Sequence, residues 1–174
     1  MRPMELVGVR VELPSNTPIV LLRALDEAGE TNEAELMLPI FIGGPEATAI
    51  ALAHEGVKPP RPMTHDLFAQ TLDAMSVQVE RVVITELRER TFFAELHMRA
   101  PDEAKVMSAR PSDAIALAVR LGVPIFAEEE LLAEVGYSDT PEETEESAEV
   151  VEDCLLYTSP SPRDQRGSRM PSSA

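Results

Sequence analysis

Side chains suited to catalysis gather at three points of the sequence, each where a strand or loop leads into an expected helix. The first point is residues 43–46 (Gly-Gly-Pro-Glu), the second is residues 61–66 (Arg-Pro-Met-Thr-His-Asp), and the third is residues 110–113 (Arg-Pro-Ser-Asp). Together they offer carboxylates, guanidinium groups, hydroxyls and one imidazole, the groups that hydrolytic chemistry on a phosphate requires. The candidate site residues are Glu46, Arg61, Thr64, His65, Asp66, Arg110, Ser112 and Asp113.

The second point places a histidine next to a carboxylate on a proline-rich loop that enters a helix. His65 beside Asp66 can act as a general base or as a metal ligand near neutral pH. The same residues are typical of an ordinary helix start, with Thr64 as the N-cap and Asp66 as an acid that complements the helix dipole. From the residues alone, both interpretations stay open.

The other two points have the same double meaning. Arg110 can clamp a phosphate with its planar guanidinium or pair with a nearby acid, and Ser112 and Asp113 are typical of an N-cap and a first-turn acid. Gly43 and Gly44 can expose backbone N–H groups to an anion, but glycines are also an ordinary way to turn a strand into a helix.

Several classes of protein are excluded by what the sequence lacks. It has no phosphate-binding Walker loop, no zinc-type histidine pair and no dinucleotide fingerprint. A single cysteine, Cys154, excludes an internal disulfide. With five Phe, two Tyr and no Trp, an extended platform for stacking nucleic-acid bases is not expected. His54 and His97 have no partner at ligand spacing and are interpreted as structural.

The charge of the chain limits how it can meet a polyanion. Acidic residues outnumber basic residues 31 to 15, for a net charge of −16, and residues 139–153 contain eight acids and no base. Binding of nucleic acid by general counterion release needs a basic surface, so any phosphate contact must come from a few placed arginines. No apolar run is long enough for a membrane-spanning helix, and a cytoplasmic location without membrane contact is expected.

The hydrophobic periodicity predicts an α+β fold in a single domain, with a mixed, largely antiparallel sheet, seven or eight strands and about four helices. Gly122 followed by Pro124 marks the end of a strongly apolar helix. Strands are expected at 4–13, 19–25, 35–42, 77–87, 91–98, 103–109 and 125–127, helices at 47–54, 64–75, 114–121 and 128–135, and a hairpin-like connection at 26–32.

The domain is predicted to occupy residues 1–138. Residues 139–153 are expected to form an acidic disordered tail, because a run of like charges cannot bury apolar surface. Residues 154–174 are rich in Ser, Pro and Arg, and the string LLYTSPSPRD within them resembles a translated sequencing adapter. This last stretch is therefore interpreted as non-native or, alternatively, as a disordered tail.

The combination of these segments resembles the bifunctional nuclease family, over roughly residues 4–137. That resemblance implies an α+β fold, hydrolysis of both DNA and RNA, and a homodimer; one departure is Ser108, where family members often carry an acid. The resemblance is carried by Leu38-Pro39-Ile40-Phe41-Ile42-Gly43 with Glu46-Ala47 and Ile50, by Arg61-Pro62-Met63-Thr64-His65-Asp66-Leu67, by Phe92-Phe93-Ala94 and by Ala109-Arg110-Pro111-Ser112-Asp113-Ala114-Ile115-Ala116-Leu117-Ala118.

The resulting hypothesis is a metal-assisted nuclease. Glu46, Asp66 and Asp113 would hold Mg²⁺ or Mn²⁺ through their oxygens, with His65 as base or further ligand. The substrate, a nucleic acid, would be bound through Arg61, Arg110, Thr64 and Ser112.

Two alternatives remain at this point. One is a non-catalytic binding or regulatory module that uses the same residues structurally, and the other is a pocket for a small phosphorylated metabolite. The nuclease hypothesis requires that the three helix starts converge in the fold.

Overall fold

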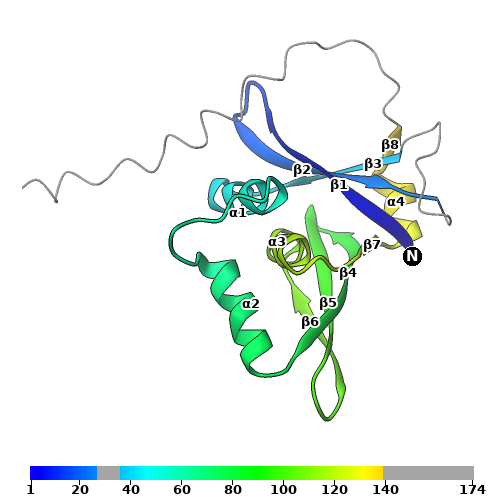
Figure 1. Ribbon diagram of the computed structural model, residues 1–174. Helices are drawn as coiled ribbons and strands as arrows, with labels where there is room; N and C mark the ends of the chain where they lie inside the picture. Colours follow the sequence, from blue (N-terminus) through cyan, green and yellow to red (C-terminus); the bar gives the residue numbers. More distant parts are fainter. Residues whose placement is uncertain (27–35, 139–174) are drawn as a thin grey trace, which may run out of the picture. The chain divides into compact units, whose positions relative to one another are not determined.

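Eight strands within the described residues, 1–26 and 36–138, form one sheet in the order β6-β5-β4-β7-β1-β2-β3-β8 (Figure 1). The structure is a computed structural model. The strands are β1 (Arg2–Glu12), β2 (Thr17–Ala24), β3 (Leu36–Phe41), β4 (Gln78–Arg88), β5 (Thr91–Arg99), β6 (Ala104–Ala109), β7 (Ile125–Ala127) and β8 (Tyr137–Ser138).

The sheet consists of two antiparallel meanders joined by a short central strand. β1, β2 and β3 pair in sequence order, as do β4, β5 and β6, and β7 lies between β1 and β4. The β4–β7 pair is parallel and the other pairs are antiparallel. This arrangement confirms the predicted α+β class and the mixed, largely antiparallel sheet.

Four helices accompany the described part of the sheet: α1 (Gly44–His54), α2 (Thr64–Ala74), α3 (Pro111–Leu121) and α4 (Glu129–Val135). Figure 1 shows α1 and α3 side by side, with α2 next to α3, in agreement with their contacts. α1 packs on β1 and β2, and α3 packs on β4 and β5. The two helices therefore cover the two meanders of the sheet. None of the helices in the described ranges is long and apolar enough to cross a membrane.

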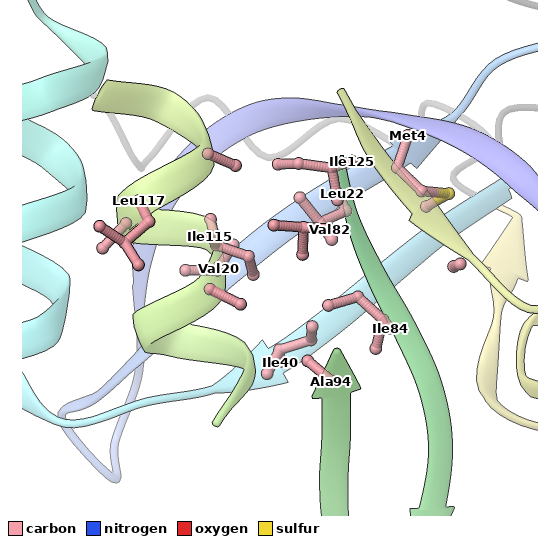
Figure 2. Packing of buried hydrophobic residues seen from close by; sticks show 14 of the residues in the cluster. Met4, Val20, Leu22, Ile40, Val82, Ile84, Ala94, Ile115, Leu117 and Ile125 are labelled. Carbon is pink, nitrogen blue, oxygen red and sulfur yellow. The ribbon is translucent and has the colours of Figure 1, made fainter. Parts of the chain in front are cut away.

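The core is built around α3, whose residues from Ala114 to Ala118 are all buried. Figure 2 shows Ile115 of this helix beside Val20 of β2 and Val82 of β4. The β-branched and leucine side chains of the strands alternate between this core face and the other face, as the strand periodicity predicts. α3 is apolar over most of its surface because it is surrounded by the sheet and by α1 and α2.

Two details of the helix starts differ from the sequence prediction. Thr64 and Ser112 are not N-caps: the caps are Met63 for α2 and Arg110 for α3, and the two hydroxyl residues lie inside the first turn. In α3 the first residue is a proline, which has no backbone N–H to cap. In both helices the third residue is an acid, whose negative charge interacts favourably with the free N–H groups of the first turn, so a capping hydroxyl is not needed. The prediction that Gly122 ends α3 is confirmed, since it takes a left-handed conformation with φ of 66°.

Three expectations fall on residues that the structure does not describe. Most of the connection at 26–32 lies in the gap at 27–35, and the segments 139–153 and 154–174 lie beyond residue 138. The chain divides into two units, Met1–Thr144 and Glu145–Ala174, and every described residue belongs to the first.

Candidate functional site

The candidate site is formed where the N-terminal ends of α1, α2 and α3 come together. Glu46, Asp66 and Asp113 are each the third residue of their helix. An acid at this position interacts favourably with the free backbone N–H groups and the positive end of the helix dipole. Helix formation therefore keeps each carboxylate at the start of its own helix, whatever it does chemically.

Arg110 connects two of these helix starts. Its guanidinium donates from Nε to Oδ2 of Asp113 at 2.7 Å and from Nη2 to Oδ1 of Asp113 at 2.9 Å. The same Nη2 also lies 3.0 Å from Oε1 of Glu46, which is 64 residues away in the sequence. This fork places a planar cation between two carboxylates, and its side chain stays 65% exposed while that of Glu46 is only 19% exposed. Of its three nitrogens, only Nη1 makes no hydrogen bond to a described residue, and this is the donor left for an incoming anion.

His65 joins the cluster from α2. Its Nε2 lies 3.1 Å from Oδ1 of Asp113, and the histidine side chain is 15% exposed. Because an ionised carboxylate only accepts hydrogen bonds, Nε2 carries the proton and donates it to Asp113. In the neutral imidazole the remaining nitrogen, Nδ1, is the acceptor. Asp113 therefore fixes both the orientation and the tautomer of His65.

The electrostatics of the cluster favour its charged forms. The hydrogen bonds from Arg110 lower the pKa of Asp113 below its ordinary value, and they outweigh burial, which acts in the opposite direction; His65 adds to the lowering. Asp113 and Glu46 in turn raise the pKa of Arg110. Both members of the Arg110–Asp113 pair are therefore held ionised across the neutral range.

Asp66 is placed differently from the other two carboxylates. Its Oδ1 accepts a hydrogen bond from Nε of Arg120 at 2.6 Å, and its Oδ2 accepts one from the backbone N–H of Met63 at 2.8 Å. Burial raises the pKa of Asp66, but the hydrogen bonds from Arg120 and Met63 prevail and leave it lowered. Asp66 therefore lies beside the site but is engaged by a different cation.

The three remaining predicted residues lie around this cluster. Arg61 and Thr64 are exposed on the loop before α2 and in its first turn, and Arg61 forms no ion pair with a described residue. Ser112 is 7% exposed and lies at the second position of α3. The structure thus brings Glu46, His65, Arg110 and Asp113 into one connected network, with Ser112 next to it and Arg61 and Thr64 at the surface.

A cavity of about 360 Å³ opens beside the network. It is lined by Glu46, Arg110 and Ser112 from the site, and also by Arg90 and Phe92 from the turn and strand that follow β4. His65 and Asp66 do not line it. Glu46 and Arg110 therefore face this cavity directly, while His65 is linked to it only through Asp113 and Arg110.

The predicted metal centre needs three carboxylates that face one point. Within the described ranges, no group of three or more His, Cys, Asp or Glu side chains is arranged to hold a metal ion. Arg110 already supplies the positive charge between Glu46 and Asp113, and Arg120 neutralises Asp66. As arranged, these residues do not fit a three-carboxylate metal centre, and the need for Mg²⁺ or Mn²⁺ stays a prediction.

Two residues of this region were not among the sequence candidates. Arg120 is the single charged residue between Ala114 and Leu121, seven positions after Asp113, so a cation at that spacing in an apolar helix was a usable signal. Arg90 had no such signal, because its place depends on the pairing of β4 with β5.

His97 contacts neighbouring strand residues rather than the site. Its Nδ1 lies 3.3 Å from Nη2 of Arg81, and its Nε2 lies 3.3 Å from Oε2 of Glu95. These contacts agree with the structural role that was expected of it.

Fold and site together define an α+β protein with a carboxylate–guanidinium network at the meeting point of three helix starts. The family described as the bifunctional nuclease domain matches residues 29–140, and the chain belongs to this family. The resemblance inferred from the motifs is thereby confirmed.

Similar proteins include both uncharacterized and named members. A protein of Mycobacterium tuberculosis that is itself called uncharacterized is 45% identical over 148 residues, which cover 85% of this chain and 84% of that protein. Bifunctional nuclease 2 of Arabidopsis thaliana is 31% identical over 118 residues, covering 65% of this chain and 34% of the plant protein. Bifunctional nuclease 1 of the same plant is 29% identical over 111 residues, covering 62% and 32%. The chain thus spans about a third of the plant proteins.

Proposed function

We propose that the protein hydrolyses phosphodiester bonds in RNA and DNA at the Arg110 network. The observation that carries the proposal is the position of the Arg110 guanidinium, exposed at a cavity and held between Glu46 and Asp113. The Nη1 group of this guanidinium, which the two carboxylates leave unused, can donate to a phosphate oxygen and stabilise the charge that develops when water attacks phosphorus. Membership of a family named for nuclease activity supports this choice of substrate.

In this proposal Glu46 positions and deprotonates the attacking water, because it lines the cavity and His65 does not. The water oxygen forms the new bond to phosphorus, Glu46 accepts the water proton, and the departing oxygen takes up a proton from solvent. Arg110 holds the non-bridging oxygens while charge builds on them. His65 acts through Asp113, which it orients by the hydrogen bond at 3.1 Å.

The other predicted residues receive supporting roles. Ser112, on the cavity wall, can donate a hydrogen bond from its hydroxyl to the substrate. Arg61 and Thr64 are exposed outside the cavity and can contact a more distant part of the nucleic acid. Asp66 is a positioning residue, since its carboxylate ties the start of α2 to Arg120. No step of this mechanism requires a divalent ion, and the predicted need for Mg²⁺ or Mn²⁺ is tested separately.

The experiment is cleavage of labelled RNA and single-stranded DNA by the purified full chain. Glu46→Gln and Arg110→Lys keep size and most packing but remove the base and the bidentate fork, and each is expected to lower turnover roughly 100- to 1000-fold. Glu86→Gln is the matched control, since Glu86 also pairs with an arginine, Arg88, but does not line the cavity. Turnover at the wild-type rate by either Glu46→Gln or Arg110→Lys would overturn the proposal.

A chelator arm and a histidine variant complete the test. Turnover that disappears in EDTA and returns with Mg²⁺ or Mn²⁺ would support the predicted metal requirement, and turnover unchanged by EDTA would contradict it. His65→Ala is expected to reduce turnover while circular dichroism shows an intact fold. Full activity of His65→Ala would remove this residue from the mechanism.

A non-catalytic binding or regulatory module is the second candidate. The observation that favours it is that Glu46, Asp66 and Asp113 each already has an arginine partner. In that case the network would serve to hold three helix starts together. Saturable binding of nucleotide or oligonucleotide with no cleavage by wild-type protein under any metal condition would establish this alternative.

A further inference from the structure

We propose that single-stranded nucleic acid follows a path across Phe41 that joins two adjacent cavities, with Arg90 and Arg10 as its phosphate contacts. This path rests on the proposed function, because it would deliver the chain to Arg110. None of these three residues was a candidate from the sequence.

Phe41 is the shared element of the path. It is the last residue of β3, it is 54% exposed, and it lines both the 360 Å³ cavity that contains Arg110 and a second cavity of about 340 Å³. Each volume is at the lower end of the range for small-ligand sites and suits one nucleotide rather than a duplex. A phenyl ring between two such cavities can stack a base on either side.

Both cavities are lined by aromatic and by cationic side chains. The first contains Phe92, Arg90 and Arg110, and the second contains Arg10 and Tyr137. Neither Arg10 nor Arg90 forms an ion pair with a described residue, so their guanidinium groups remain available. This combination of stacking rings with separated cations is what binding of a single strand requires.

The local charge differs from that of the chain. The three arginines that line the two cavities are balanced by Glu12, Glu46 and Asp113, which bonds Arg110, so this region carries no net negative charge on a protein of net charge −16. The excess of acids in the rest of the chain disfavours general binding of a polyanion, so we expect few phosphate contacts, made by individual arginines. Binding should therefore release few counterions and depend on salt only weakly, with a slope of about 2 for three phosphate contacts to a single strand.

The backbone holds Arg90 at a defined point of the path. Glu89 and Arg90 form the turn between β4 and β5, and both have positive φ values, 49° and 64°. Two residues with positive φ match the tight hairpin turn that the strand twist favours, where Asn or Gly is usual. A long charged residue is conformationally unfavourable at a positive φ. At this position the Arg90 side chain lines the cavity, where it can contact a phosphate.

The test measures the Kd of the full chain for a fluorescent oligothymidylate by anisotropy. This measurement reports binding and does not depend on cleavage. Arg90→Gln, Arg10→Gln and Phe41→Ser are each expected to raise Kd about ten-fold. Arg88→Gln is the matched control for the arginines, since Arg88 belongs to the same hairpin but pairs with Glu86. Leu67→Ser controls for loss of an exposed apolar side chain, since Leu67 is 59% exposed on α2.

Failure of the path and failure of the proposed function give different results. Path variants that bind and cleave like wild type, or a duplex that binds as tightly as the single strand, would overturn the path and leave the nuclease proposal standing. Binding that follows the predicted variants without any cleavage by wild-type protein would support the path and overturn the nuclease proposal. Arg90 and Phe41 are exposed, so their variants should fold, and circular dichroism checks this.

Discussion

At the scale of single residues, the site depends on one helix position used three times. Glu46, Asp66 and Asp113 each occupy the third position of a helix, but each has a different set of partners. Glu46 shares Arg110 with Asp113, while Asp66 is bound to Arg120 and to the Met63 backbone. Equivalent local positions therefore give two acids at the candidate site and one that supports it.

The lowered pKa values of Asp66 and Asp113 predict how stability responds to acid. A depressed folded-state pKa means that the ionised form stabilises the fold above the ordinary value of 3.8, and that this contribution is lost as pH falls through the depressed value. Asp66→Asn should therefore unfold at lower urea concentration than wild type at pH 7, and the two should converge as the pH is lowered well below the ordinary value.

The control for this comparison is Asp73→Asn, the same substitution at an exposed position of the same helix. Its urea midpoint should follow that of wild type at every pH. A difference in urea midpoint between wild type and Asp66→Asn that stays constant down to the lowest pH would show that the ionised carboxylate of Asp66 is not the source of the stability.

The two glycines before Glu46 predict a separation of activity from stability. A Cβ added at Gly43 would contact the carboxylate end of Glu46, whereas a Cβ at Gly44 would meet open space. Gly43→Ala should therefore displace Glu46 and lower turnover about ten-fold or more, while Gly44→Ala leaves turnover unchanged. Steady-state kinetics with thermal unfolding of both variants checks this, and equal turnover would show that the position of Glu46 is not critical.

At the scale of elements, Arg120 ties three helices together. From α3 it donates to Asp66 of α2 at 2.6 Å and to the backbone carbonyl of Ala49 in α1 at 3.0 Å, and it also bonds Ala116 within its own helix. Its side chain is only 9% exposed, so water cannot replace these bonds easily. The geometry of the site therefore relies on an ion pair outside the site.

Removing this side chain should destabilise the fold. Arg120→Ala removes the cation that neutralises Asp66 and the side-chain donor that links the carbonyls of Ala49 and Ala116, and a loss of about 2–3 kcal/mol in the free energy of unfolding is expected. Arg99→Ala, which breaks an exposed ion pair with Glu80, should lose less than about 1 kcal/mol. Urea titration measures both, and equal losses would contradict the anchoring role of Arg120.

The elements were largely predictable because each carries a local pattern. The alternation in β1 and β4 and the apolar run of α3 followed by Gly122 identify strand and helix without reference to the rest of the chain. The central placement of β7 was not predictable, because three residues are too short to show a period and their pairing is decided by tertiary contacts.

The sequence indicates which residues are candidates for the site, but it does not indicate which of them contact one another. The nuclease hypothesis requires Glu46, His65 and Asp113 to converge, but the sequence does not determine whether they do, since this depends on how α1, α2 and α3 pack. The partner of Asp66 could not be chosen from sequence for the same reason. The Mg²⁺ or Mn²⁺ site and the homodimer stay predictions.

At the scale of the whole molecule, charge is unevenly distributed along the chain. Residues 1–138 have 22 acids and 12 bases, a net charge of −10, and residues 139–153 add eight further acids. Long-range repulsion of a polyanion sums over all these charges, whereas capture depends on a few arginines. Acidity outside the site should therefore slow the approach of nucleic acid without changing the site itself.

Replacing the eight acids of residues 139–153 with Asn and Gln in the full chain tests this. The net charge would change from −16 to −8, and the association rate with labelled oligothymidylate should rise several-fold at low ionic strength. The difference should vanish near 0.5 M salt, where charges are screened within a few ångströms. A rate difference that persists at high salt would show that the segment acts by another route.

The position of β7 has a consequence for how the protein is made. β7 pairs with β1 on one side and with β4 on the other, so the two meanders are joined through a strand that ends at Ala127. A ribosome must therefore synthesise nearly the whole domain before the sheet can become continuous. Until then the emerging chain exposes the facing edges of β1 and β4, and this interval is when it most needs protection from aggregation.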